Sequence, residues 1–313
     1  MLHDREVMFR QLAHLSGLSL ERLASLCEVA EAGSIGQASR GDANRQSLLS
    51  RQIAELETVF GAALLARKSR PFRLTREGRE LAQAARQFFT VADDLQRRAE
   101  NAAQRVVIGA GETLIQWLLF PACEVIQRQA GKIVFSFKNL DSTRLIESLQ
   151  QGEIDLALMR REDVTPSLAH TEPWAYTQAA FVPKGLDHAS TAIRIQELAT
   201  LPWAVLEGRG HFRQFLESKA RERSIKLNAV LECSSYTQVA MAIQTGRYAG
   251  FLPEFAKNSA FSRNSTVVQR ALAPCLKYER TLVLAWREAA IKSRWHLEPL
   301  IGQLQEKLFR RNP

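Results

Sequence analysis

The segment AEAGSIGQASRGDANRQSLLSRQIAELETVFG, residues 30–61, is followed by a short basic segment, RKSRPFRLT, at residues 67–75. Apolar residues recur at helical spacing just before the first segment, which predicts a helix that closes near Ala32. A short second helix is expected over residues 35–40, and a third begins after Gly41, where glycine permits the turn. Three helices and a basic hairpin together predict a winged helix-turn-helix domain over residues 18–78.

The third helix has two chemically different faces. Asp42 or Asn44 is expected to cap it. Its core-facing stripe consists of Leu49, Ile53 and Leu56, and its opposite face carries Gln46, Ser47, Ser50, Arg51 and Ala54. Glutamine can bond adenine edges, arginine can bond guanine or phosphate, and serine suits either. The pattern therefore predicts a recognition helix in a major groove.

The basic segment that follows is interpreted as a β-wing. Its cations are Arg67, Lys68, Arg70, Arg73 and Arg76, and they would lie on DNA phosphates. The alternative is a helical bundle with one solvated, charged face, because helix-turn-helix patterns are degenerate.

A resemblance to a known family favours the first interpretation. The matching residues are Ala30, Glu31, Gly33, Ser34, Ala38, Gln46, Leu49, Ser50, Arg51, Gln52, Ile53, Leu56, Glu57, Gly61, Leu64, Leu74, Thr75 and Gly78. Through this set, residues 20–78 resemble the DNA-binding domain of LysR-type transcriptional regulators. The departures lie around the turn, at Ser39, Asp42, Asn44, Arg45 and Ser47, so operator sequences of other members are not transferable. The expected DNA-binding residues are Ser34, Arg45, Gln46, Ser47, Ser50, Arg51, Arg67, Arg70, Arg73 and Thr75.

A long linker helix is expected next, over residues 79–103. Its apolar residues alternate at steps of four and three, namely Leu81, Ala85, Phe88, Ala92, Leu95 and Ala99. Such a heptad seam pairs helices, although the same pattern also suits a helix packed on its own domain. The resemblance implies pairing, because the family joins its DNA-binding domains through this helix. Two recognition helices would then contact two half-sites of a roughly palindromic operator.

Downstream of residue 104 the pattern changes to short apolar runs that alternate with helical segments. Strands are predicted at 105–110, 133–137, 154–159, 179–182, 203–206, 230–233, 249–252 and 281–286. Helices are predicted at 113–129 (broken or kinked at Pro121), 141–151, 211–223 and 236–246, and a closing helix carries Leu297, Leu300, Ile301, Leu304 and Leu308. This alternation predicts parallel sheets with right-handed crossovers.

The resulting α/β region resembles a two-lobed, periplasmic-binding-protein-like effector domain, the usual second domain of the family. One lobe is expected to comprise residues 104–163 and 267–313, and the other residues 164–266. The clearest marks are Gly152 and Asp155 in LQQGEIDLAL and the turn GRYAGFLP. Asp155 has no His, Ser or Lys partner at a catalytic spacing, so we expect it to bond backbone.

A ligand is expected beyond the carboxyl ends of the strands, where helix N-termini point. The residues so placed are Glu112, Thr113, Asp141, Ser142, Thr143, Arg209, Gly210 and Ser235. Arg209 and the helix N-termini favour an anion, whereas Glu112 and Asp141 oppose one, so the sequence leaves the ligand's charge open. Each polar residue in the set also suits a helix cap.

The composition is that of a globular protein of two or three domains, with 313 residues, 46% hydrophobic and 24% charged. No apolar run approaches the roughly 18 residues of a membrane span, and residues 1–17, which precede the family pattern, lack the features of a secretory signal. The expected location is therefore the cytoplasm. The net charge of +9 suits a nucleic-acid partner. Residues 105–313 nevertheless hold most of the surplus, with 27 Lys and Arg against 20 Asp and Glu, which suits either solvated surface or an anionic ligand.

The cysteines and histidines are dispersed, and no catalytic or metal-ligand spacing occurs. Cys27, Cys123, Cys233 and Cys275 are expected to be reduced thiols. Because part of the family uses a redox-sensing cysteine pair, Cys233 is the candidate to test for that role. No cofactor, metal or enzymatic activity is expected.

The sequence thus predicts a LysR-type regulator that binds double-stranded DNA as a homodimer or homotetramer and responds to a small molecule between its lobes. RNA polymerase is a further partner that the resemblance implies. One alternative is a regulator that binds DNA without any ligand. Another is an enzyme or solute-binding protein with a vestigial N-terminal domain, which the missing signal peptide and catalytic residues oppose.

Overall fold

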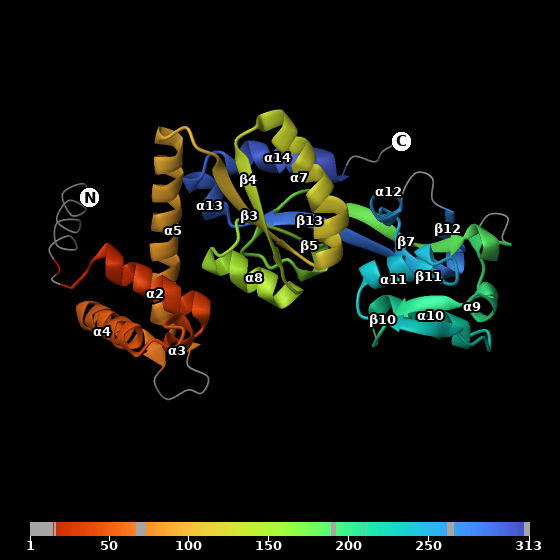
Figure 1. Cartoon of the computed structure of the whole chain (residues 1–313), viewed down its shortest axis with the longest axis horizontal. Helices are drawn as coiled ribbons and strands as arrows, with labels where there is room; N and C mark the ends of the chain where they lie inside the picture. The colour runs from red at the N-terminus through yellow and green to blue at the C-terminus, as the bar shows by residue number, and fades with distance from the viewer. Residues whose placement is uncertain are drawn as a thin grey trace. The chain divides into compact units, whose positions relative to one another are not determined.

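The computed structural model describes residues 15, 17–66, 73–188, 192–208, 210–261 and 266–309 (Figure 1). The chain divides into two compact units. The first unit comprises residues 1–104, 147–153 and 292–294, and the second comprises the remainder. No helix of the described residues is both long and apolar enough to cross a bilayer.

The first unit begins with the predicted three helices. They are α2 (Leu20–Ala32), α3 (Ile35–Ala38) and α4 (Ala43–Phe60). Gly33 ends α2 in a left-handed conformation, and Gly61 does the same for α4. The Asp42 side chain caps α4 by accepting from the N–H groups of Asn44 and Arg45, so Asp42 is the cap, and Asn44 is not. The expected helix-turn-helix is confirmed.

The core of this unit joins α4 to its neighbours. Buried Leu49, Ile53 and Leu56 form the predicted apolar stripe, and they pack against Leu26 and Val29 of α2. The wing hairpin is the antiparallel pair β1 (Leu65–Ala66) and β2 (Arg73–Leu74). The long helix α5 (Arg76–Ala99) follows directly.

The second unit contains two lobes. In the first lobe β4 (Ile133–Asn139), β3 (Gln104–Ala110), β5 (Leu156–Arg160) and β13 (Glu279–Trp286) lie in that order. β3 and β5 are parallel, and β13 is antiparallel to β5. Asp155 accepts from the N–H of Val107, as expected for a carboxylate that bonds backbone. The remaining elements are α6 (Glu112–Leu114), a π-helix (Ile115–Leu119), α7 (Phe120–Ala130), a 3-10 turn (Arg161–Asp163), β6 (Ala169–His170) and α14 (Leu297–Phe309). Two further helices, α8 (Ser142–Gln151) and α13 (Glu288–Ser293), begin in this unit and end in residues that belong to the first.

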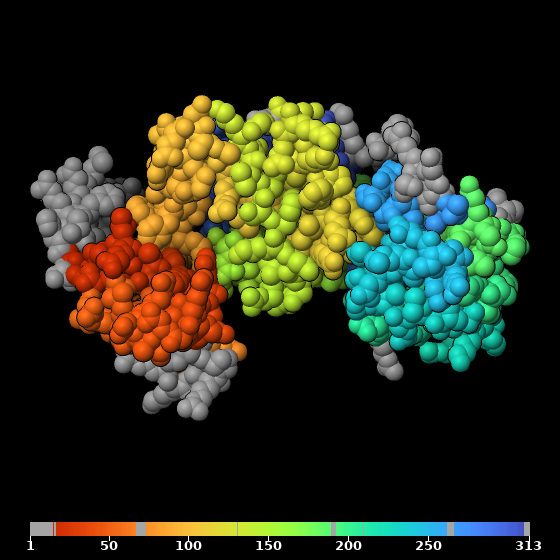
Figure 2. Space-filling model, viewed as in Figure 1, coloured from red at the N-terminus to blue at the C-terminus, as the bar shows by residue number. Residues whose placement is uncertain are grey.

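In the second lobe β10 (Ala229–Cys233), β9 (Trp203–Leu206), β11 (Ala249–Pro253) and β7 (Trp174–Pro183) lie in that order. The helix α11 (Tyr236–Gln244) covers the face of this lobe that is visible in Figure 2. The others are 3-10 turns (Lys184–Leu186 and Pro274–Leu276), β8 (Ala192–Ile193), α9 (Glu197–Thr200), α10 (His211–Arg221), α12 (Ala256–Ala260) and β12 (Val267–Leu272).

One strand, β7, pairs with strands of both lobes, and the antiparallel strand β13 lies beside its first half. The first half of β7 pairs with β13, and its second half pairs with β11 and β12. β13 continues beyond Leu282 to pair with β5. The lobes are therefore joined by a two-stranded ribbon centred near Tyr176 and Arg280.

Two features differ from the sequence-based expectation. β12 pairs with β7 and β8, so residues 267–272 belong to the second lobe's sheet, and the return to the first lobe starts with β13. The irregularity expected at Pro121 is a π-helical segment that precedes it; the chain remains helical from Glu112 to Ala130, so Pro121 lies inside a continuous helix just after the wider π-turns.

Candidate DNA-binding surface and effector cavity

The outer face of α4 is open to solvent. Gln46, Ser47, Ser50 and Arg51 are all exposed, as a recognition helix requires. On the inner side, Gln52 is buried, donates to Glu21 over 2.8 Å and accepts from the Ser25 hydroxyl. This network ties α4 to α2, so the exposed side chains project from a fixed helix.

Three of the expected DNA-binding residues have structural roles. Ser34 caps α3 by accepting from the N–H of Gln37. Thr75 caps α5 and donates its hydroxyl to the carbonyl of Ala63 over 2.6 Å. Arg45 forms an ion pair with Glu28, so part of its charge is neutralised in the free protein.

Only part of the expected wing surface is described. Arg73 is exposed on β2, whereas Arg67 and Arg70 lie outside the described residues. The hairpin position and exposure of Arg73 suit a phosphate contact.

The helix α5 exposes the far half of its predicted seam. Leu81 is half-buried and Ala85 buried, whereas Phe88 and Leu95 are 52% and 54% exposed. Large apolar side chains this exposed on one helix mark a face that suits association with another apolar surface.

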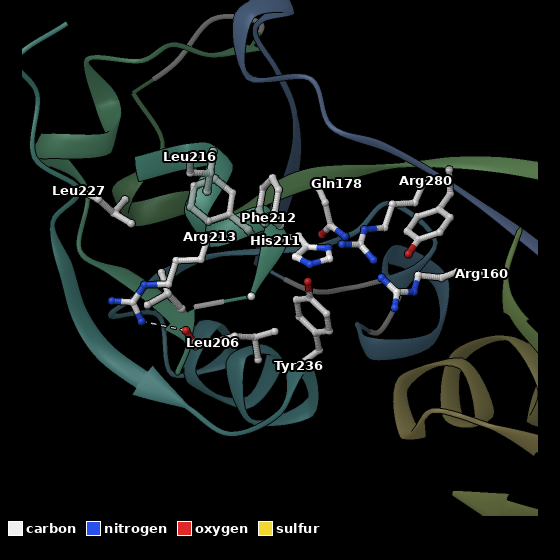
Figure 3. A pocket seen from close by; sticks show the side chains of 14 residues that line it. Arg160, Gln178, Leu206, His211, Phe212, Arg213, Leu216, Leu227, Tyr236 and Arg280 are labelled. Atoms are coloured by element: carbon white, nitrogen blue, oxygen red, sulfur yellow. Dashed lines mark hydrogen bonds between the residues drawn. The ribbon is translucent and has the colours of Figure 1, made fainter. Parts of the chain in front are cut away.

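A cavity of about 390 Å³ lies beside the ribbon that joins the two lobes (Figure 3). Tyr176 and Gln178 reach it from β7, Arg280 from β13, and Arg160 from the end of β5. The second lobe supplies the rest, from β9, α10, α11 and β11. Pockets of a few hundred cubic ångströms at such junctions are typical of small-molecule sites.

One end of the cavity is polar, and the other is apolar except for Arg213, which lies beside Leu206 and Leu227 in Figure 3 and donates to the Leu206 carbonyl. Figure 3 shows Arg160 and Arg280 at one end, Leu216 and Leu227 at the other, and His211 between them. The apolar end adjoins an aromatic cluster in which Phe251 stacks on Trp203 with ring centroids 4.1 Å apart and meets Phe212 edge-on at 5.6 Å.

Two tyrosines near the polar end stay protonated at neutral pH. Burial raises the pKa of Tyr236, and a hydrogen bond from Gln178 opposes that rise. Burial also raises the pKa of Tyr176, against the field of Arg280. Both phenols are therefore neutral hydrogen-bonding groups.

Of the eight expected effector residues, Gly210 lines the cavity. Ser142 is close by, because its hydroxyl donates to Asp163, which also pairs with Arg160. Several others form local bonds: Ser235 caps α11, Asp141 accepts from the N–H of Arg144, and Glu112 accepts from Gln116. Thr113 is half-buried and Thr143 exposed, and neither is among the lining residues; Arg209 lies outside the described residues.

Sequence reasoning missed the arginines of the cavity. Arg160 and Arg280 each belong to a strand that is otherwise largely apolar, LALMR and ERTLVLAW. A guanidinium at such a position was the signal that could have indicated them.

Comparison with known proteins assigns the chain to a family. Residues 20–79 match the model described as "Bacterial regulatory helix-turn-helix protein, lysR family", and residues 99–308 match the "LysR substrate binding domain". The second match alone spans more than half of the chain. The chain belongs to the LysR family. This LysR-family protein is a DNA-binding transcriptional regulator with a substrate-binding domain of the effector-responsive type.

The LysR-family regulator has both sequence and structural relatives. It is 24% identical over 291 residues to the probable nitrogen assimilation transcriptional activator of Synechococcus elongatus, covering 90% of this chain and 94% of that one. It is 31% identical over 189 residues to the regulator MetR of Escherichia coli, covering 58% of each chain. A full-length point variant of OxyR from Pseudomonas aeruginosa shares the fold with a TM-score of 0.66 and 18% identity, over 95% of this chain and 99% of that one. CbnR, solved in complex with its target DNA, has a TM-score of 0.55 and 17% identity, over 94% and 99%.

Cys233, the candidate redox cysteine, and Cys123 are poorly placed for redox sensing. All four are free thiols, and Cys233 and Cys123 are buried. Burial raises the pKa of Cys233, which lowers the fraction of reactive thiolate. Within the described residues no group of His, Cys, Asp or Glu side chains could hold a metal ion.

Proposed function

We propose that this LysR-family regulator binds its operator through the exposed face of α4 and through the wing, and that a small effector in the ribbon cavity controls that binding. The observation that carries the DNA-binding part is the exposure of Gln46, Ser47, Ser50 and Arg51 on one face of a helix whose other face is buried.

The side chains of this surface fall into two groups, one suited to base edges and the other suited to phosphates. Gln46 and Arg51 carry the groups that bond base edges, whereas Arg73 and the N-terminal caps suit phosphates. Arg45 would have to exchange Glu28 for phosphate, so its contribution would depend on salt more than on sequence.

Pairing of two chains through α5 completes the proposed DNA-binding form. The exposed Phe88 and Leu95 continue the heptad seam, and burying both against a partner helix would remove apolar surface from water. A dimer presents two α4 helices to two half-sites, whereas one helix alone contacts only a few base pairs.

The ribbon cavity is the proposed effector site, because both lobes contribute side chains to it. A ligand that contacts Arg160 of one lobe and Phe212 of the other favours one relative orientation of the lobes over others. The protein would act in the cytoplasm, where its DNA is, and RNA polymerase is the proposed downstream partner.

The DNA-binding proposal is tested with Arg51→Ala. The promoter fragment is first identified by mapping bound sites across the genome, and its affinity is then measured by fluorescence anisotropy at fixed salt. Loss of a base contact costs about 1–3 kcal/mol, which raises Kd about 5- to 150-fold. Arg128→Ala is the matched control, since that arginine is 74% exposed on α7, in the other compact unit.

Both variants lose one positive charge, so a difference between their Kd values for the operator reports the position of the arginine and not the change in net charge. A Kd for Arg51→Ala equal to that of Arg128→Ala would refute the assigned helix face. A loss in Arg51→Ala that persists equally on unrelated DNA would assign Arg51 to phosphate rather than to bases.

A further inference from the structure

The residues that line the ribbon cavity indicate the chemical class of the molecule that it accepts. This inference rests on the proposed effector role of the cavity.

The charge of the lining is one-sided. Its described members include three arginines and a histidine, and no Asp or Glu is among them. Two of the arginines are already compensated. Arg213 pairs with Glu217 and Glu232, and Arg160 pairs with Asp163 and with Glu162.

Arg280 is different from the other two. It is half-buried on β13, where it donates to the Tyr278 hydroxyl over 3.0 Å and lies over that ring at 5.2 Å. Among the described residues, no carboxylate forms an ion pair with it. Glu162, which pairs with Arg160, acts on Arg280 only at longer range, so this half-buried guanidinium keeps its two-pronged face for a carboxylate, which it binds through two parallel hydrogen bonds.

A second observation at the same end also indicates a ligand. Gln178 is only 4% exposed, and its Oε1 has no hydrogen-bond partner among the described residues. Figure 3 shows its amide between Arg280 and Tyr236. An unsatisfied buried amide oxygen is costly and needs a hydrogen-bond donor, so it indicates an O–H or N–H group on a ligand at this end; a carboxylate, which only accepts, would not satisfy it.

The first turn of α10 adds to the preference for an anion. Gly210, His211 and Phe212 line the cavity, and Gly210 caps this 11-residue helix without any side-chain acceptor. The partial positive charge of the helix start is therefore directed at the same space.

The far end of the cavity has the opposite character. Phe212, Leu216, Leu227 and Phe251 are each at most 9% exposed, and they form an apolar wall. A doubly charged metabolite would place a second anionic group against this wall, where no described cation is uncompensated. The volume of about 390 Å³ equals that of about 13 water molecules at about 30 Å³ each, which suits a body of about ten non-hydrogen atoms.

We propose that the effector is an amphipathic monocarboxylate, with its carboxylate on Arg280 at the polar end of the site and its aliphatic or aromatic body against Phe212, Leu216 and Leu227. The juxtaposition of an unpaired guanidinium and an apolar pocket selects it against dicarboxylates and against neutral analogues of the same shape.

The test uses the full-length protein without DNA, and thermal shift followed by calorimetry. The probes are the straight-chain acids from butyrate to decanoate, benzoate and 3-phenylpropionate, each beside its own primary amide, with succinate and glutarate as dianions. We expect at least one monocarboxylate to raise Tm in a manner that depends on chain length, and to bind at least about tenfold more tightly than its amide.

Arg280→Gln should abolish the advantage of the acid over the amide, while Arg128→Gln should leave it unchanged. Arg280→Lys keeps the charge without the fork and should restore part of the advantage, which separates ligand binding from a general effect of Arg280 on folding. The proposal is overturned if no monocarboxylate shifts Tm, if acid and amide bind equally, if a dianion binds best, or if Arg280→Gln retains wild-type selectivity.

Operator binding, measured separately by anisotropy with and without the best probe, distinguishes the two proposals. A monocarboxylate that binds through Arg280 and leaves operator affinity and footprint unchanged would contradict the regulatory role and leave the ligand class intact. If operator binding requires Arg51 but no probe binds in the calorimeter, the proposed ligand class is contradicted and the proposed DNA-binding surface is left intact.

Discussion

Gly78 occupies a position in the wing region that no other residue can fill without displacement. It lies in the first turn of α5, buried, with its N–H donated to the cap Thr75. A Cβ added there would overlap the carbonyl oxygen of Leu64 and lie 3.0 Å from its carbonyl carbon. Both are backbone atoms, so no side-chain rotation can relieve the contact. Gly78→Ala must therefore move the start of α5 away from the strand that opens the wing.

The size of the effect follows from this overlap. Restoring an ordinary contact needs a shift of about 1 Å, and overpacking of that kind costs about 1–3 kcal/mol. The same shift weakens the bonds that Thr75 makes to the carbonyls of Ala63, at 2.6 Å, and Leu64, at 3.0 Å, each worth about 0.5–1.5 kcal/mol. The better helix propensity of alanine offsets about 1 kcal/mol of this cost, so we expect the free energy of unfolding to fall by about 1–5 kcal/mol.

Gly36→Ala is the matched control. Gly36 is helical in α3, and a Cβ there would meet no atom within 4 Å, so this variant should be neutral or slightly stabilising. Hydrogen exchange of peptides from residues 18–80 in the full-length protein reports the stability of this unit alone, and anisotropy reports its affinity for DNA. Faster exchange and weaker binding are expected for Gly78→Ala only. If the hydrogen-exchange rates of Gly78→Ala equal those of the wild type, the close approach of α5 to Leu64 does not limit the residue at position 78.

Three further predictions follow from the described contacts. Gln52→Ala leaves the buried Ser25 hydroxyl without its partner and should lower the free energy of unfolding in urea by about 1–3 kcal/mol. The double variant Ser25→Ala, Gln52→Leu should lose less stability than the sum of the losses in Ser25→Ala and Gln52→Leu measured singly. Losses that simply add would argue against the bond between the two side chains. Burial raises the pKa of Cys123 from 9.0 to about 12, so at pH 8 iodoacetamide should label exposed Cys275 well before Cys123 in mass spectra. Because folding holds the Cys123 proton more tightly, the stability that this adds is complete below pH 9 and declines as pH rises towards 12, and Cys123→Ala should remove that decline. Phe88→Asp should shift the protein to smaller species in light scattering and weaken operator binding, and an unchanged mass would exclude this face of α5 from the dimer.

The helix-turn-helix was predictable almost to the residue, because its signals are local. Glycines mark the ends of α2 and α4, an Asx cap starts α4, and the stripe Leu49, Ile53 and Leu56 has one periodicity over the whole helix. None of these signals depends on distant residues, so tertiary packing had little opportunity to override them.

The effector region was predictable as a pattern of elements but not as a site. β7 was expected over residues 179–182, yet it starts at Trp174, because its first half pairs with β13, a partner more than a hundred residues away. The general rule for strand ends selected helix starts such as Ser235, whose hydroxyl proved to cap α11. The cavity instead lies against the ribbon, and its position depends on the register between Tyr176 and Arg280, which no local pattern specifies.

The ribbon strands β7 and β13 have a mechanical consequence. β7 runs unbroken from the second lobe's sheet into the ribbon, and β13 runs unbroken from the ribbon into the first lobe's sheet, so no flexible loop separates the lobes at this point. Antiparallel two-stranded ribbons tolerate a wide range of twist, whereas bending within their own plane would stretch ladder hydrogen bonds. A bound molecule would therefore act on this protein as a torque about the ribbon axis, and a spectroscopic probe pair placed one on each lobe should report a change in dihedral angle rather than a change in separation.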